Sequence, residues 1–181
     1  MPPFDPPPTL DGPTFRLAPL RAGDIPALTE AVSDPVTWAG HPATDRYKPE
    51  IFTPYAEKLL AAGGTLTLTD RAQDRITGCS RYYPVPGEED GIGIGFTFLH
   101  HSYWGTGANR EVKRLMLDHA FAHVPEVWFH IAPTNIRSQK ATAKLGARFV
   151  REEPLGFLGA PPVATFSYRL TRATWTRQTS S

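Results

Sequence analysis

The sequence predicts an α+β fold built on a single mixed sheet, and three observations support that prediction. The chain has 181 residues, a length that favours one domain. An alternating strand at 65–69 is followed by a return strand at 76–83, which indicates an antiparallel hairpin. The second half alternates strand, helix, strand, helix and strand, an order typical of α+β proteins. We therefore expect about seven strands, mostly antiparallel, flanked by helices.

The N-terminal part is expected to hold a tail, a strand and two helices. Residues 1–13 contain six prolines, which favours a flexible, polyproline-like tail. The alternation of apolar and polar residues at 15–20 predicts the first strand. Asp24 is placed to cap the first helix. A second helix is expected to begin at Pro49 or Pro54.

The remaining elements are expected to follow the hairpin without long interruptions. In chain order they are strand 92–98, helix 107–123, strand 127–131, helix 135–145, strand 147–151 and strand 163–170. Gly146 is a typical stop signal for the helix before it. We expect the domain to cover residues 14–176, with residues 177–181 as a C-terminal tail.

Composition and charge argue against several classes of protein. The chain has 19 basic and 18 acidic residues and a net charge of +1, so we expect no nucleic-acid partner. It has no apolar run of about 18 residues and no basic flank leading into one, so we expect neither a membrane span nor a secretory signal. Cys79 is the one cysteine and cannot form an internal disulfide, which favours a reducing, cytoplasmic setting.

The strand at 92–98 has one large face and one nearly bare face. Isoleucine and phenylalanine occupy its even positions, whereas Gly93, Gly95 and Thr97 occupy the odd ones. Glycine weakens a strand and is tolerated where a bulge forms or where another group approaches the backbone closely. The bare face therefore indicates either a crowded packing position or a place for a ligand.

A glycine-containing loop, Trp104-Gly105-Thr106-Gly107-Ala108-Asn109, precedes the helix at 107–123. The two glycines allow a tight turn, and a helix N-terminus adds free N–H donors with about half a positive charge. Together these features suit a pyrophosphate. The loop has neither the lysine of a P-loop nor the third glycine of a dinucleotide fingerprint. Arg110, Lys113 and Arg114 on the next turns either form a solvated face or reach phosphates.

These motifs, taken with those that follow them, resemble a known family. The strand, the loop, the helix, a further strand and Asn135-x-x-Ser138, which opens a helix ending Lys144-Leu145-Gly146-Ala147, resemble the GNAT superfamily of acyl-CoA-dependent N-acetyltransferases. Residues 15–20 followed by Ala22-Gly23-Asp24-Ile25 resemble the start of its RimJ/RimL-like branch. The resemblance covers about residues 14–176.

The resemblance implies acetyl-CoA as co-substrate, held where two neighbouring strands splay apart. It implies direct transfer of the acetyl group to a primary amine, on a protein N-terminus or on a small molecule. The residues that would contact the cofactor are Phe96, Phe98, Leu99, Trp104, Gly105, Thr106, Gly107, Ala108, Asn109, Asn135 and Ser138.

At two positions where many relatives of this family carry a catalytic side chain, this sequence has a different residue. The position of the usual strand glutamate is Gly93, so a water chain or a carboxylate of the preceding loop, above all Glu89, is the candidate base. The position of the usual tyrosine is Thr142, so Ser138 is the candidate acid for the departing thiolate. Alternatives are a catalytically weak acyl-CoA-binding or sensing module and a nucleotide-binding domain that uses the same loop.

The acceptor and other partners are less defined. In this family the segments of Trp38, His41 and Tyr82, together with Tyr83, flank the acceptor side. His130 lies either near the thioester or in a satisfied structural position. His119 and His123 are spaced like a metal pair but have no evident third ligand, so we expect no metal. A homodimer is compatible with the sequence.

Overall fold

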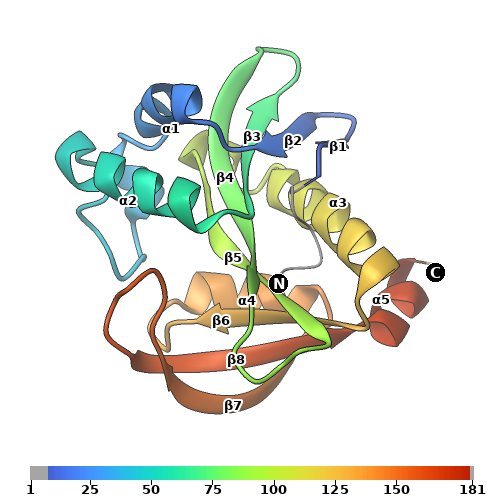
Figure 1. Cartoon of the computed structure of the whole chain (residues 1–181). Coiled ribbons are helices and arrows are strands. Elements are labelled where there is room, and N and C mark those ends of the chain that lie inside the picture. Colours follow the sequence, from blue (N-terminus) through green and yellow to red (C-terminus); the bar gives the residue numbers. More distant parts are fainter. Residues whose placement is uncertain (1–7, 180–181) are drawn as a thin grey trace.

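Residues 8–179 are described by the structure, a computed structural model, and they form one eight-stranded sheet with five α-helices (Figure 1). The strand order is β1-β2-β3-β4-β5-β6-β8-β7. The strands are β1 (Leu10–Asp11), β2 (Phe15–Pro19), β3 (Thr65–Asp70), β4 (Arg75–Pro84), β5 (Gly91–Leu99), β6 (Glu126–Ile131), β7 (Arg148–Leu155) and β8 (Val163–Thr171). The α+β prediction with a mostly antiparallel sheet is confirmed.

The helices follow the predicted order. They are α1 (Ile25–Ala31), α2 (Pro49–Ala62), α3 (Ala108–His123), α4 (Ile136–Lys144) and α5 (Arg172–Thr179), with 3-10 turns η1 (Ala22–Asp24), η2 (Pro35–Trp38) and η3 (His101–Tyr103). Asp24 does not cap α1 with its side chain; its carboxylate instead accepts the Arg21 N–H at 2.9 Å, one turn earlier. Gly146 follows α4 with φ +86°, a left-handed conformation that glycine adopts without strain.

The ordered structure extends beyond the expected domain at both ends. Leu10 and Asp11 pair with β2 as an eighth strand, inside the segment expected to be a tail. Residues 1–7 of that segment lie outside the described residues. At the other end α5 continues through Thr179, past the expected boundary at residue 176. Trp175 anchors α5, since its side chain is 8% exposed and its Nε1–H donates to Asp118 Oδ1 at 2.7 Å.

Helices cover both faces of strands β2–β5, because successive strand residues point to opposite faces. Figure 1 shows α1 and α2 on one side of these strands and α3 on the other. The α3 side buries Leu17, Leu68 and Ile92 with Met116 of α3. The α1–α2 side buries a separate cluster that includes Leu28, Phe52, Leu59, Cys79 and Phe98.

The parallel pair β5–β6 is the exception in the sheet and the feature that positions the site. Its register covers three residue pairs, Gly91–Glu126, Ile92–Val127 and Gly93–Trp128. Beyond them the two strands have no further paired residues, while β5 continues to Leu99 and β6 to Ile131. The splayed strand pair implied by the sequence is therefore present.

We expect Trp175→Ala to destabilise the protein by about 3 kcal/mol, because it removes a buried aromatic side chain from the contact between α5 and α3. Urea unfolding followed by far-UV circular dichroism measures the loss. The matched control is Trp104→Ala, which removes a tryptophan that is 38% exposed and should cost much less. Equal losses in the two variants would show that α5 does not contribute to the fold.

Candidate active site

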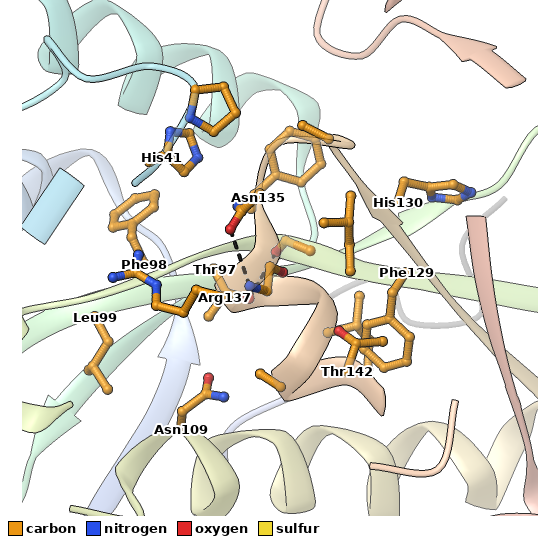
Figure 2. A pocket seen from close by; sticks show the side chains of 18 of the residues that line it. His41, Thr97, Phe98, Leu99, Asn109, Phe129, His130, Asn135, Arg137 and Thr142 are labelled. Carbon is orange, nitrogen blue, oxygen red and sulfur yellow. Dashed lines mark hydrogen bonds between the residues drawn. The ribbon is translucent and has the colours of Figure 1, made fainter. Parts of the chain in front are cut away.

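A cavity of about 450 Å³ opens where β5 and β6 diverge (Figure 2). Its walls come from β4, β5, β6, the start of α3, α4, η2 with the connection after it, α2, and Phe157 between β7 and β8. Of the expected cofactor residues, it is lined by Phe96, Phe98, Leu99, Trp104, Asn109, Asn135 and Ser138. The cavity thus brings together residues that lie far apart in the sequence.

The loop before α3 has the expected backbone. Gly105 and Gly107 have φ of +76° and +90°, and Gly107 begins α3 without a side-chain cap. The Ala108 N–H donates to Thr106 Oγ1 at 3.3 Å, and Gly107 has no side chain to cap the amides that follow. Trp104 and Asn109 border the cavity, whereas Thr106, Gly107 and Ala108 border a second hollow that Glu111 also lines.

Arg137 is a cavity residue that was not predicted from the sequence. Its guanidinium carbon lies 4.0 Å from the Trp104 ring centroid, a cation–π contact that joins α4 to the loop before α3. The Trp104 Nε1–H donates to the Leu99 carbonyl at 3.2 Å, which fixes the indole. The contact places a positive charge beside Trp104, the first residue of the glycine-containing loop. Its position one residue before Ser138 was the only signal in the sequence.

Asn135 is the N-cap residue of α4, and the hydrogen bond that caps the helix orients its side chain. Its Oδ1 accepts the Ser138 N–H at 3.1 Å, which leaves the side-chain NH₂ group to donate elsewhere (Figure 2). The Ser138 hydroxyl lines the cavity and makes no hydrogen bond to another of residues 8–179. The helix start thus presents an amide, a hydroxyl and a partial positive charge to one region of the cavity.

A β-bulge in β5 lies at the centre of the site. Cys79 pairs with Phe98 and Arg81 with Gly95, so that two residues of β5, Phe96 and Thr97, oppose Ser80 alone. Phe96 has φ +53°, a left-handed conformation that is strained for a bulky residue. The bulge interrupts the ladder with β4 and leaves main-chain groups of β5 available on the cavity side.

Lys113 of α3 forms hydrogen bonds to both strands at this bulge. Its Nζ donates to Thr97 Oγ1 at 2.6 Å and to Ser80 Oγ at 3.3 Å, and the two hydroxyls are 2.7 Å apart. The side chain is 7% exposed and borders the cavity, and no carboxylate among residues 8–179 pairs with it. Burial lowers the pKa of Lys113 to about 7. The alternative of a purely solvated helix face is therefore wrong for Lys113.

The bare glycine face of β5 is a packing position. A Cβ atom at Gly93 would collide with the ring of Tyr83, and one at Gly95 would lie 3.1 Å from it. The Tyr83 hydroxyl is 2.8 Å from His130 Nδ1. Burial raises the pKa of Tyr83 and lowers that of His130 to about 4, so both are neutral at pH 7. The tyrosine ring fills the space that a larger side chain at position 93 would need.

The residues expected on the acceptor side divide into two groups. Trp38 and His41 border the cavity with their rings 5.2 Å apart, and the Trp38 Nε1–H donates to the Val32 carbonyl at 2.8 Å. The expectation for Tyr82 is wrong. Its side chain points to the opposite face of β4, where its hydroxyl donates to the Met116 carbonyl at 2.7 Å. Tyr83, one residue later, faces the cavity instead.

The structure does not bring the candidate base to the cavity. Glu89 is exposed in the connection between β4 and β5, and Glu88 forms an ion pair with Arg151 at 3.2 Å. Of the residues that the structure describes, neither an aspartate nor a glutamate lines the cavity. Within residues 8–179, the site therefore has no carboxylate base of its own.

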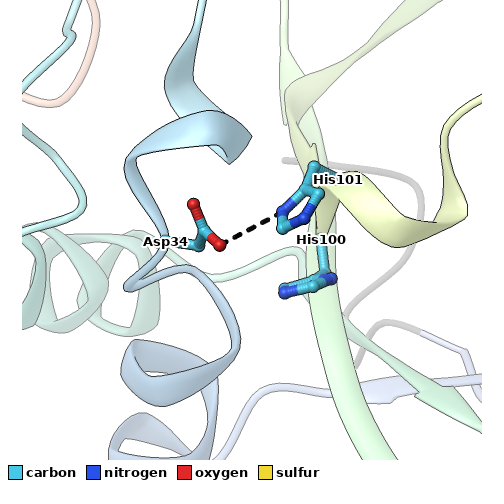
Figure 3. Close-up of side chains that lie close together, drawn as sticks. All are labelled: Asp34, His100 and His101. Carbon is cyan, nitrogen blue, oxygen red and sulfur yellow. Dashed lines mark ion pairs between the residues drawn. The ribbon is translucent and has the colours of Figure 1, made fainter.

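One group of three potential metal ligands occurs in the described part of the chain, Asp34, His100 and His101 (Figure 3). His101 Nδ1 lies 3.7 Å from Asp34 Oδ2, while Asp34 Oδ1 accepts the Val36 N–H at 2.8 Å. The two histidines are half-buried. We interpret the group as a contact that joins η2, which carries Trp38, to the turn before the glycine-containing loop.

The pKa of Lys113 predicts how stability depends on pH. Because this pKa is lowered on folding, the unfolded chain binds more protons between about pH 7 and the ordinary lysine value of 10.4. The contribution of Lys113 to stability therefore rises with pH across that window and is least favourable below pH 7. Lys113→Met should remove this dependence, which for one proton approaches about 1.4 kcal/mol per pH unit.

Urea unfolding of the wild type and Lys113→Met from pH 6 to 10 tests this prediction. The advantage of the variant should be largest at pH 6 and shrink steadily toward pH 10. Lys140→Met, at an exposed lysine of α4, is the matched control and should run parallel to the wild type. A parallel profile for Lys113→Met would contradict the prediction.

Comparisons with known proteins agree with the geometry of the site. The family model described as acetyltransferase (GNAT) domain matches residues 14–148, more than half of the chain. No curated protein matches the sequence. Among solved structures, a GCN5-related N-acetyltransferase from Brucella melitensis superposes with a TM-score of 0.78 at 17% identity, covering 93% of this chain and 80% of that one.

Two further structures have similar folds. A putative acetyltransferase from T. thermophilus is 25% identical, with a TM-score of 0.72 over 96% of this chain and 94% of that one. RimL, a ribosomal L7/L12 alpha-N-protein acetyltransferase in complex with coenzyme A, is 12% identical, with a TM-score of 0.70 over 92% and 99%. From the matched domain and the splayed site, the chain belongs to the GNAT acetyltransferase family.

Proposed function

We propose that this protein is an N-acetyltransferase that moves an acetyl group from acetyl-CoA directly to a primary amine. The observation that carries the proposal is the cavity between the diverging strands β5 and β6, with the start of α3 at one end. The acceptor is a protein N-terminus or a small-molecule amine. Membership of the family favours catalysis over the alternative of a weak acyl-CoA-binding module.

The residues present suit acetyl-CoA. The start of α3 and the Arg137 guanidinium supply donors and positive charge for phosphates. We assign Trp104 to Asn109 to the pyrophosphate region and the main chain of Phe96, Phe98 and Leu99 to the pantetheine region. The Asn135 amide, oriented by its cap, would contact pantetheine from the other wall.

The bulge in β5 supports a role in polarising the thioester. An N–H near Phe98, freed from the ladder with β4, would donate to the carbonyl oxygen on which negative charge develops. Lys113 lies directly behind this segment through Thr97, so its charged form would stabilise the same oxygen through space. The start of α4 and the Ser138 hydroxyl would stabilise the departing thiolate.

Deprotonation of the acceptor is assigned to solvent. Glu89 lies outside the cavity and the described lining holds no carboxylate, so we propose that the amine loses its proton to water before or during attack. The attacking nitrogen forms a bond to the acetyl carbon, the C–S bond breaks, and the coenzyme leaves as its thiol.

The location of the enzyme, its branch of the family and its partners are part of the same proposal. We propose a cytoplasmic enzyme of the RimJ/RimL-like branch, active without a metal or a nucleic-acid partner and compatible with a homodimer. None of the helices within residues 8–179 has the length and apolar character needed to cross a membrane.

Gly107→Val should abolish acetyl-CoA binding while the fold survives. The substitution places a β-branched side chain at φ +90°, over the amides of the loop. Wild-type protein at about 100 times the dissociation constant should gain about 2.7 kcal/mol of stability from acetyl-CoA, seen as a higher melting temperature.

Gly87→Val is the matched control, because Gly87 has φ +79° with open space around it and lies in the connection between β4 and β5. It should carry the same backbone strain and keep the full shift with acetyl-CoA. An undiminished shift in folded Gly107→Val would remove the loop from the cofactor site.

Activity should rise with pH until the acceptor amine is neutral. Unperturbed α-amino groups titrate near 8 and lysine-type amines near 10.4. Between pH 6 and 9, kcat/KM should level off near pH 8 for a peptide N-terminus and keep rising for a lysine-type amine. Release of coenzyme A thiol, followed with a thiol-reactive dye, measures both profiles.

Lys113→Met is the control for this experiment, because Lys113 itself titrates in the same range. Its rates should fall most below pH 7, where Lys113 is charged, while the rise that follows the acceptor amine should remain. Flat profiles for both acceptors, under conditions where chemistry limits the rate, would demonstrate an efficient base in the protein.

A further inference from the structure

The charges that line the cavity are unusual for a site that receives an amine. Its cationic side chains are Arg46, Lys113 and Arg137, and within residues 8–179 no acidic side chain lines it. A primary amine arrives as a cation at neutral pH. Of the described residues, no carboxylate in this lining attracts that cation, and three side chains repel it. An acceptor that carries its own negative charge would fit such a lining better than a simple alkyl amine.

Two of the three cationic side chains already have a role, one in the proposed phosphate region and one in hydrogen bonds within the protein. Arg137 stacks on Trp104 at the loop before α3, where the proposed function places phosphates. Lys113 is buried and donates to Thr97 and Ser80. Arg46 is the cation that remains, and it lies in the connection between η2 and α2.

Arg46 is held in place by aromatic rings rather than by a carboxylate. Its guanidinium carbon lies 3.9 Å from the Tyr55 ring centroid and 5.8 Å from that of Trp38. Of the described acidic residues, none forms an ion pair with it. Burial, followed by the Arg46 charge, lowers the pKa of His41 to about 4, so His41 adds no positive charge at pH 7. A stacked guanidinium keeps its donor edges free for a planar anion.

Arg46 also belongs to the part of the cavity lining that the proposed function does not assign to acetyl-CoA. The connection between η2 and α2 lines the cavity together with Phe157, from the connection between β7 and β8. Figure 1 shows both connections on the same side of the molecule. Trp38, His41 and Tyr55 form the surrounding wall, so the anion site is one charge set in an aromatic surface.

We propose that Arg46 binds the carboxylate of an acceptor in which that carboxylate lies a few bonds from the primary amine. This inference rests on the proposed acetyltransferase function and names its substrate class. The chemistry occurs in two sources, a free amino acid and a peptide with an acidic residue next to its N-terminus. The carboxylate takes no part in the bond changes; it positions the amine and offsets the cationic lining.

The test compares acceptors that differ only in this charge. One arm uses an amino acid and its carboxamide, and the other uses tripeptides with aspartate or asparagine at the second position. Values of kcat/KM from thiol release are corrected for the fraction of free amine. In at least one arm the wild type should prefer the carboxylate member by about ten-fold or more, the effect expected of a charge-assisted hydrogen bond. The arm that shows the preference identifies the source.

Arg46→Gln should lower kcat/KM for the carboxylate member by about ten-fold and leave the neutral member within about two-fold. Arg46→Lys should keep part of the preference, because it retains the charge without the planar fork. Arg148→Gln, at an exposed arginine of β7 outside the cavity, should behave as the wild type. The melting-temperature shift with acetyl-CoA is measured for every variant and should not change.

Each contrary outcome has a distinct meaning. Acetyl-CoA binding with equal rates for charged and neutral acceptors in both arms would overturn this inference and leave the proposed function standing. A smaller shift with acetyl-CoA in Arg46→Gln, with both acceptor classes equally slowed, would make Arg46 a cofactor contact and also overturn it. Absence of both acetyl-CoA binding and transfer in the wild type would overturn the proposed function, and this inference with it.

Discussion

The site depends on the early end of one strand pairing. Strands β5 and β6 are the parallel neighbours of the sheet, and they pair over three residues before they separate. A parallel pair can part in this way only if other contacts hold each strand. On β5 those contacts are the bulge at Phe96 and Thr97 and the hydrogen bonds of Thr97 and Ser80 to Lys113. The amine of Lys113 loses water in this position, and two hydroxyl groups replace it only in part.

The same arrangement links the two halves of the molecule. Lys113 belongs to α3, whose first turn presents amides at one end of the cavity, and its hydrogen bonds end on β4 and β5. Trp104 and Arg137 connect that end of the cavity to α4, and the start of α4 presents Asn135 and Ser138. The walls formed by β5, α3 and α4 are therefore fixed to one another by named contacts, which limit how far any one of them can shift alone.

Much of this fold could be read from the sequence, because its signals are local. Alternation at 65–69, the glycines at 105 and 107 and the stop at Gly146 each describe a backbone within a few residues. Contacts between residues that lie far apart in the sequence could not be predicted from such local signals. Positions 82 and 83 are both tyrosine. Only the register of β4 decides that Tyr83 faces the cavity and Tyr82 faces Met116. Arg46 gave no local signal and Arg137 only its place beside Ser138, because their partners are rings elsewhere in the chain.

The ring of Tyr83 constrains what else the strand can carry. It occupies the space beside Gly93, which the family resemblance identifies as the position of the usual strand glutamate. A larger side chain at 93 and an aromatic ring at 83 therefore exclude each other. Introducing a carboxylate alone would displace the ring and break its hydrogen bond to His130, and removing the ring alone would leave a void without supplying a base. Placing a carboxylate on this part of the strand therefore requires that positions 93 and 83 change together.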